Sequence, residues 1–415
     1  MNSGDTAFVL LCAAMVCFMT PGLAFFYGGL VRKQHVLTIM MQNFISMGVV
    51  TVIWFVCGFS LAFGTDVHGI IGNLQYAFLN GVGMQPSTLY GQTIPFLAFF
   101  AFQLMFAIIT PALITGAFAD RMSFKGYLLF VALWSIAVYI PIAHWVWGGG
   151  FLQQMGVVDF AGGLVVHESA GVAALASAIF IGKRHIVPGE STSPHNATYV
   201  ALGTGILWFG WFAFNGGSAL AANAVAAVAV VNTGIAGASA MLTWLCIGWF
   251  LEKKPGVTGS LVGSIVGMAA VTPGSGFVQP WSALLIGIAA AAVVYMVIRL
   301  LKKSAVDDAL DVFGAHGVGG VLGTLLLGVL AVKSVGGAAG LIDGNPMQFL
   351  IQLGAVAIVG VYSFGMTFLL LKLINRFVPV RVPEAEERKG LDGYLHGEAA
   401  YEFAGTVTQT DLHNK

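Results

Sequence analysis

The chain contains eleven runs of mostly apolar residues, and this feature constrains its fold more than any other. An α-helix needs about 20 such residues to cross the hydrocarbon core of a bilayer. The runs cover residues 6–31, 36–64, 94–119, 124–147, 162–182, 196–216, 227–251, 257–273, 280–301, 312–332 and 347–377. The sequence therefore predicts an all-α integral membrane protein with eleven transmembrane helices.

Composition supports a surface that faces lipid. Hydrophobic residues make up 58% of the chain and charged residues only 9%, whereas soluble domains carry about 25% charged residues. The formal net charge is zero, which gives nucleic-acid binding no electrostatic support. No basic region precedes the first apolar run, so we expect a transmembrane helix there and not a cleaved signal peptide.

The distribution of basic residues predicts the orientation. Every Lys and Arg except Lys333 lies after an odd-numbered helix or at the C-terminal end. Because basic loops stay in the cytoplasm, the N-terminus is expected outside and the C-terminus inside a plasma (bacterial inner) membrane. We expect a multi-pass transmembrane domain over 1–376 and a cytoplasmic C-terminal regulatory tail over 377–415, although composition alone also fits a merely solvated tail. Residues 65–93 have no Lys or Arg and predict an outer surface loop.

The sequence predicts no cofactor and no metal site. The four cysteines lie inside apolar runs, without the spacing of metal ligands, and a disulfide framework is not expected. They are Cys12, Cys17, Cys57 and Cys246.

Two segments of the chain resemble each other. Leu-Ala-Phe-Phe-Tyr-Gly-Gly at 23–29 closes the first helix, and Trp-Phe-Ala-Phe-Asn-Gly-Gly at 211–217 closes the sixth. These two helices run in opposite directions in the predicted topology. Helices one to five and six to ten therefore form an inverted 5+5 repeat, followed by helix eleven, and such repeats place a transport site at their interface near the midplane.

Two histidines occupy matching positions in the two halves. His167 and His316 each precede a glycine by four residues, and each follows an acid, Asp159 or Asp311. An ionisable group inside a membrane span indicates function. Two imidazoles that meet would share a proton and leave one nitrogen facing a pore, where it can accept a hydrogen bond from a small substrate. Two separate histidines bonded to backbone carbonyls are the structural alternative.

Two acids lie near His167. Asp159 is eight residues earlier, about 12 Å along a helix, where it either caps the helix or stabilises a cation. Glu168 points about 100° away from His167. If buried, it must be protonated or paired, and it is either a proton-relay member or an inter-helix contact.

Aromatic side chains gather near the outer ends of three predicted helices. Aromatic faces beside a hydroxyl make a site for a small, weakly hydrated cation, although an interfacial aromatic belt also occurs at this depth. The residues are Phe102 and Phe106 in the third helix, Trp147 in the fourth, and Trp211, Phe214 and Ser218 in the sixth.

Several motifs together resemble the superfamily of ammonium transporters, methylamine permeases and Rhesus proteins, specifically its bacterial and archaeal ammonium transporter branch. The motifs are Phe-Tyr-Gly-Gly-Leu at 26–30, Gly-Ala-Phe-Ala-Asp-Arg-Met at 116–122, Ile-Ala-His-Trp-Val-Trp-Gly-Gly-Gly at 142–150, Asp-Phe-Ala-Gly-Gly at 159–163, Gly-Trp-Phe-Ala-Phe-Asn-Gly-Gly-Ser at 210–218 and Asp-Val-Phe-Gly-Ala-His-Gly-Val-Gly-Gly at 311–320.

The resemblance implies a membrane-embedded homotrimer with one pore per subunit, which recruits ammonium, deprotonates it and conducts ammonia with separate proton transfer. Methylammonium is a further candidate substrate, and a trimeric signal protein of the PII type is a candidate cytoplasmic partner. Matched motif by motif, the implied roles are recruitment by Phe102, Trp147 and Ser218, a gate of Phe106 and Phe214, and a pore with proton relay at His167, His316 and Asp159.

Other functions compete with this one. An ammonium sensor or transceptor and a Rhesus-type gas channel share the fold, and a membrane enzyme with a metal on His167 and Glu168 is a third alternative. An apolar pore with a proton-accepting histidine pair would reject potassium by desolvation while passing ammonia. We therefore expect a transporter and not an enzyme.

Overall fold

The computed structural model describes residues 1–186, 189, 191 and 193–401. Within this part of the chain, eleven helices are long and apolar enough to cross a membrane, which confirms the predicted all-α membrane fold. They span Ser3–Leu30, Lys33–Phe63, Phe96–Ile114, Phe124–Gln154, Gly163–Ile181, Ala197–Gly217, Ala224–Glu252, Val257–Gly274, Pro280–Leu301, Phe313–Leu330 and Pro346–Phe377.

Several of these spans consist of more than one helical element. The α-helices are α1 (Ser3–Leu30), α2 (Val36–Ile53), α3 (Phe59–Phe63), α4 (Phe96–Ile114), α5 (Phe124–Trp134), α6 (Ile140–Trp147), α7 (Phe151–Gln154), α8 (Ser169–Ile181), α9 (Ala197–Gly217), α10 (Ala224–Glu252), α11 (Val257–Val271), α12 (Pro280–Leu301), α13 (Gly319–Leu330), α14 (Lys333–Gly336), α15 (Pro346–Phe377) and α16 (Glu384–Lys389). Strands β1 (Asp66–Val67) and β2 (Ile71–Gly72) form an antiparallel pair in the connection after α3.

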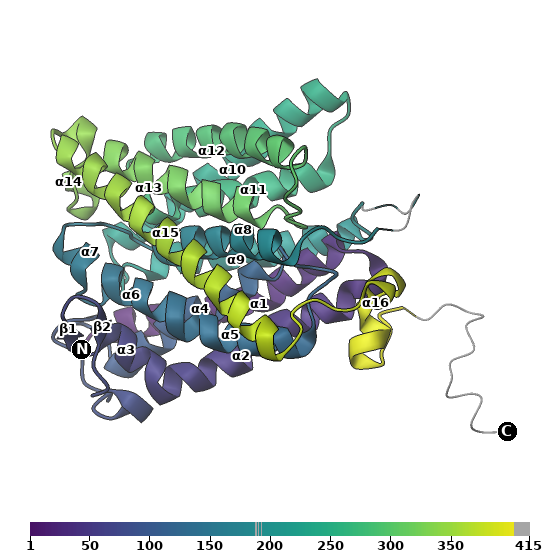
Figure 1. The fold of residues 1–415 in the computed structure, drawn as a ribbon. Coiled ribbons are helices and arrows are strands. Elements are labelled where there is room, and N and C mark those ends of the chain that lie inside the picture. The colour runs from purple at the N-terminus through teal and green to yellow at the C-terminus, as the bar shows by residue number, and fades with distance from the viewer. Residues whose placement is uncertain (187–188, 190, 192, 402–415) are drawn as a thin grey trace.

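The helices form one bundle whose two ends differ in content. Figure 1 shows the N-terminus, β1, β2, α7 and α14 at one end and α16 at the other. The connections that carry almost all basic residues lie at the α16 end. We call this end cytoplasmic and the opposite end outer, following the prediction from the basic loops, which stays a prediction.

The third span is shorter than predicted. The apolar run extends to residue 119, but α4 ends at Ile114 and turns follow. The carbonyl of Ala117 accepts a bond from the Arg121 guanidinium and a 3.3 Å bond from the Ala309 amide. The local Arg121 side chain and the distant Ala309 amide together replace the intrahelical partner that a longer helix would supply.

Glycines allow α1 and α9 to cross closely. A Cβ on Gly203 would lie 2.3 Å from the backbone nitrogen of Phe26, and one on Gly210 would lie 2.1 Å from Met19 Cγ. Small residues serve this purpose in membrane helix pairs, where close packing of backbones drives association. The first and sixth spans, which carry the repeated segments, are thus direct neighbours.

The fifth and tenth spans also cross on glycines. A Cβ on Gly171 would lie 2.0 Å from the backbone nitrogen of Gly317, and one on Gly320 would lie 3.0 Å from His167 Cβ. Both spans begin with a π-helical turn, Gly163–Glu168 before α8 and Phe313–Val318 before α13. The glycine four residues after each histidine is therefore the point where the two halves of the inverted repeat meet.

Candidate functional site

A cavity of about 230 Å³ opens at the outer end of the bundle. Trp147 and Ser218 line it together with Asp159 and Tyr90, and the ring of Phe106 forms part of its wall. Phe102, predicted to belong to the same site, is buried behind this wall, where its ring meets Phe106 edge-on at a centroid distance of 5.0 Å. The predicted recruitment residues thus lie close together, but Phe102 supports the wall from behind.

Asp159 caps the helix that carries His167. Its Oδ1 accepts bonds from the amides of Gly162 and Gly163 at 2.8 and 2.7 Å, and its Oδ2 accepts bonds from two further amides, those of Leu164 and Val165. Burial raises the pKa of this carboxyl, and the four amide donors act against that rise. Capping and cation stabilisation were the two alternatives from sequence; the structure establishes the cap and also places the carboxylate in the wall of the outer cavity.

The Trp147 indole is fixed by the same loop. Its Nε1 donates to the carbonyl of Asp159 at 2.8 Å, and its ring meets Phe106 edge-on with centroids 5.9 Å apart. Ser218 ends α9, and its hydroxyl donates to the carbonyl of Phe214 at 2.8 Å. The hydroxyl oxygen keeps its acceptor capacity, since a serine hydroxyl has two lone pairs.

Phe106 and Phe214 separate the outer cavity from a second one below it. Their ring centroids are 4.1 Å apart and the rings are tilted by 31°. Phe106 lines the outer cavity, whereas Phe214 lines the inner one. The two rings, in contact with each other, therefore lie between the two cavities.

The inner cavity contains both histidines. Its volume is about 20 Å³, which is sufficient for about one molecule of the size of water. The other lining residues are almost all apolar: Met19, Leu23, Phe26, Ile109, Leu113, Val166, Leu207, Trp211, Phe214 and Ile265.

The two imidazoles contact each other through one nitrogen each. The Nδ1 atoms of His167 and His316 are 3.3 Å apart, and the rings stack with centroids 5.2 Å apart. One Nδ1 must carry a hydrogen and the other a lone pair. In two neutral rings, one Nε2 is then a donor and the other an acceptor, and His167 Nε2 has no partner among the described residues. The pair thus presents one donor and one acceptor to a small molecule.

Glu168 faces away from the histidine pair. Its side chain is fully buried, and neither carboxyl oxygen has a hydrogen-bond partner in the described part of the chain. A Cβ added to Gly360 of α15 would lie 3.2 Å from Oε1. Of the two roles left open by the sequence, this position favours the inter-helix contact.

The cytoplasmic counterpart of Asp159 is Asp308, which the sequence analysis missed. Its Oδ2 accepts a 2.7 Å bond from the amide of Phe313, five residues later, as Asp159 does with Leu164. The interpretation of Asp311 as the matching acid was wrong, because Asp311 instead forms an ion pair with Lys302 at 3.0 Å. The signal was present in the sequence, since Asp159 and Asp308 each precede a histidine by eight residues.

Asp308 is expected to make stability depend on pH. Burial and the neighbouring Asp311 raise its pKa from 3.8 to about 7, and its Oδ1 has no partner among the residues that the structure describes. Between these values the folded state binds more protons than the unfolded state, so stability falls as the pH rises through this window, by up to about 4 kcal/mol. In thermal unfolding, the Tm of the wild type should therefore fall from pH 5 to pH 8 by more than that of Asp308→Asn.

The asparagine side chain of the Asp308→Asn variant keeps an acceptor for the Phe313 amide but has no carboxyl group to titrate. Asp343→Asn, on an outer loop where Asp343 accepts a bond from the Lys333 amide, is the matched control and should follow the wild type. Parallel pH profiles for Asp308→Asn and the wild type would show that Asp308 does not titrate in this range.

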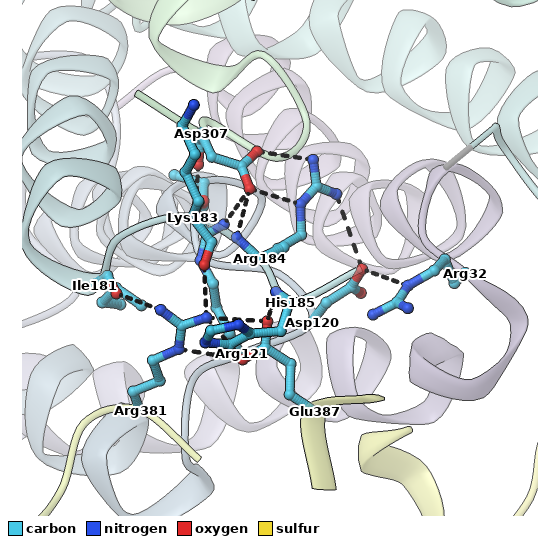
Figure 2. Close-up of polar contacts among 11 residues, drawn as sticks. Arg32, Asp120, Arg121, Ile181, Lys183, Arg184, His185, Asp307, Arg381 and Glu387 are labelled. Carbon is cyan, nitrogen blue, oxygen red and sulfur yellow. Dashed lines mark hydrogen bonds and ion pairs between the residues drawn. The ribbon is translucent and has the colours of Figure 1, made fainter. Parts of the chain in front are cut away.

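A second polar cluster lies at the cytoplasmic end and is shown in Figure 2. Asp307 forms ion pairs with Arg121 and Arg184, each at 2.8 Å, and Asp120 lies 3.2 Å from Arg32. Burial alone would raise the pKa of Asp307, but Arg184 and Arg121 outweigh it and lower the pKa to about 2. The sequence does not reveal these pairs, because the acidic partners are 186 and 123 residues away from Arg121 and Arg184.

Residues 378–401 dock beside this cluster, where the Val382 amide donates to the carbonyl of Arg121 at 3.0 Å. Arg381 pairs with the buried Glu387 at 2.8 Å and donates to the carbonyl of Ile181 at 2.9 Å, as Figure 2 shows. Asp392 accepts bonds from the amide and hydroxyl of Thr38, both at 2.8 Å. The predicted tail thus begins as a segment docked on the cytoplasmic loops, and residues 402–415 lie outside the described part.

Comparison with known proteins assigns a family to this arrangement. A profile of the Ammonium Transporter Family matches residues 7–401. An ammonium transporter of Bacillus subtilis is 47% identical over 405 residues, covering 97% of this chain and 99% of that protein. The crystal structure of Candida albicans Mep2 matches with a TM-score of 0.87 at 34% identity, covering 93% of this chain and 88% of that one. A structure described as a sensor Amt protein matches with a TM-score of 0.87 at 30% identity, covering 95% and 98%.

Proposed function

The chain belongs to the ammonium transporter family, and from this premise we propose a mechanism in which it captures ammonium outside, strips its proton and conducts ammonia past two histidines. It is a multi-pass membrane protein and not an enzyme. The observation that carries the mechanism is the pair of rings, Phe106 and Phe214, between a polar outer cavity and an apolar inner one.

Capture takes place in the outer cavity. The Trp147 ring offers its face and the Ser218 hydroxyl offers an oxygen, while the Asp159 carboxylate adds negative potential. A cation over an aromatic face gains about 0.5–2 kcal/mol, more as water is excluded. Phe102 contributes through the position it gives to Phe106.

Deprotonation takes place at the ring pair of Phe106 and Phe214, because the inner cavity beyond it is apolar and disfavours an ion. An isolated ion transferred to such apolar surroundings loses its hydration without a counter-ion. Ammonia has no such penalty, and the histidine pair offers it one donor and one acceptor. The proton from ammonium passes to the acceptor Nε2 of the histidine pair, the hydrogen between the two Nδ1 atoms shifts to the other ring, and the Nε2 of that ring releases its own proton. His167 and His316 are thus the proposed relay, and ammonia moves separately.

Selection against potassium follows from the same geometry. Potassium resembles ammonium in size but cannot lose a proton or donate a hydrogen bond. It would have to enter the inner cavity as a bare ion. The pore therefore selects by chemistry and not by diameter.

Current on a solid-supported membrane tests this function. Purified protein in liposomes is exposed to a jump in ammonium concentration and, separately, to an equal jump in potassium, with empty liposomes as the control. We expect a current with ammonium only. An equal potassium current would contradict the selective mechanism, whereas silence with both ions would favour neutral ammonia conduction, a gas channel or a sensing role.

We also propose that the chain acts as a homotrimer and that the docked segment 378–401 couples the cytoplasmic face to the pore. The contacts of Arg381 and Asp392 support this coupling, since they join the segment to loops between spans. A PII-type protein is a proposed partner for this face. The mass of the detergent-solubilised complex, measured by light scattering, tests the trimer.

A further inference from the structure

The outer loop is attached to the fourth span by a group of hydrogen bonds outside the pore. Acceptors at the end of α3 and on the loop face donors of residues 144–151. The bonds are His144 Nδ1 to the carbonyl of Ala62 at 2.9 Å, His144 Nε2 to Asp66 Oδ1 at 2.8 Å, Trp145 Nε1 to the carbonyl of Ile70 at 2.8 Å and the Phe151 amide to the carbonyl of Gly69 at 2.9 Å.

Both ring nitrogens of His144 face acceptors. A backbone carbonyl can only accept, so Nδ1 must carry a hydrogen for the contact with Ala62. The second contact requires another proton between Nε2 and Asp66. The Asp66 carboxyl also accepts a 2.9 Å bond from the Gly69 amide through Oδ2, and the His144 contact lowers its pKa. A second proton on Nε2 satisfies both His144 contacts and leaves the Asp66 carboxylate free to accept from Gly69, which gives an imidazolium paired with a carboxylate.

This pair joins two walls of the outer cavity. On one side, Ala62 precedes Phe63, which lines the cavity and packs edge-on against Tyr90 at a centroid distance of 5.2 Å. On the other side, His144 lies one helical turn before Trp147 on α6. The His144 side chain is fully buried, whereas Asp66 is partly exposed.

We propose that Asp66 and His144 are positioning residues for the outer cation site, and that their imidazolium–carboxylate pair holds the Phe63 and Tyr90 wall in register with Trp147. The inference rests on the proposed function of the outer cavity as the capture site. Neither residue lines that cavity. Loss of the pair should therefore weaken ammonium capture and leave passage beyond Phe106 unchanged.

The charge state of His144 is tested by nitrogen-15 NMR of the full-length, histidine-labelled protein in liposomes at pH 7.5. We expect a signal from a histidine ring with both nitrogens protonated that depends on Asp66. In Asp66→Asn, which keeps the shape but removes the charge, that signal should become one of a neutral ring. A neutral His144 in the wild type would overturn the proposal.

The positioning role is tested by ammonium-driven current with Asp66→Asn. We expect a several-fold higher apparent KM with an unchanged maximal rate. His68→Gln is the matched control, because His68 is an exposed titratable residue on the same loop, and it should behave as the wild type. An unchanged KM, or an equal change in His68→Gln, would overturn the proposal.

Failure of this inference differs from failure of the proposed function. A wild-type protein without an ammonium response would contradict ammonium capture while leaving the NMR signature of His144 intact. The Tm of Asp66→Asn, compared with that of the wild type, shows whether the variant folds. A misfolded variant would lose maximal rate as well as affinity.

Discussion

Asp159→Ala is expected to abolish ammonium-driven current. The substitution removes the acceptor for four amides at the start of the span that carries His167. Each buried amide left without a partner costs about 1–3 kcal/mol, so this turn should rearrange and displace the histidine. It also removes the only acidic side chain among the residues that line the outer cavity in the described part of the chain. We expect a fall in rate of at least about a hundredfold, which corresponds to about 2.7 kcal/mol.

Two variants help to interpret this experiment. Asp343→Ala removes another outer-loop carboxylate that accepts a backbone bond, from the Lys333 amide, but it lies outside the pore and should transport normally. Asp159→Asn keeps the shape of the cap with half of its acceptors and should fold better than the alanine variant. Wild-type current in Asp159→Asn would show that the cap matters and the charge does not. Wild-type current in Asp159→Ala would contradict both roles.

His316→Leu is expected to slow ammonium transport about tenfold while still excluding potassium. The variant keeps an apolar inner cavity but removes one partner of the 3.3 Å contact with His167. Ammonia then loses one hydrogen bond in the cavity, worth about 0.5–1.5 kcal/mol, and the shared proton disappears. Initial currents after ammonium and potassium jumps, normalised to the amount of protein in the liposomes, measure both effects.

Ile265→Leu is the matched control for this experiment. Ile265 lines the same inner cavity, and a swap that conserves volume is usually tolerated in a packed interior. It should leave the ammonium current within about twofold of the wild type. A full ammonium current in His316→Leu would mean that the pair is dispensable, and a new potassium current would mean that the histidines, and not the apolar walls, exclude the ion.

Much of the candidate site was predictable because the inverted repeat marks it twice. The histidines, their glycines and the eight-residue spacing to an acid recur in both halves. Asp311 is closer to His316 in sequence, but only Asp308 has the eight-residue spacing that Asp159 has to His167. The number of residues between two positions on a helix determines the relative directions of their side chains. Here the eight-residue spacing to the histidine places an aspartate at the first turn of each span.

Other features were out of reach of the sequence. Nothing in the local pattern connects Asp66 with His144, Asp307 with Arg121 and Arg184, or Asp392 with Thr38, because these partners are between 78 and 354 residues apart. Phe102 shows the same limit. Its spacing to Phe106 predicts a shared helix face, but only packing decides which ring lines the cavity.

The eleven membrane spans could be predicted from the sequence, because span length and hydrophobicity are local properties that the bilayer selects. The positions of the basic residues carry the predicted orientation for the same reason. Which polar groups contact each other depends instead on the packing of the helices. Glycine contacts between Gly171 and Gly317 bring the two histidines within hydrogen-bonding distance, and the rings of Phe106 and Phe214 pack against each other between the two cavities. Such contacts depend on how helices cross in three dimensions, and no local pattern along the chain specifies that.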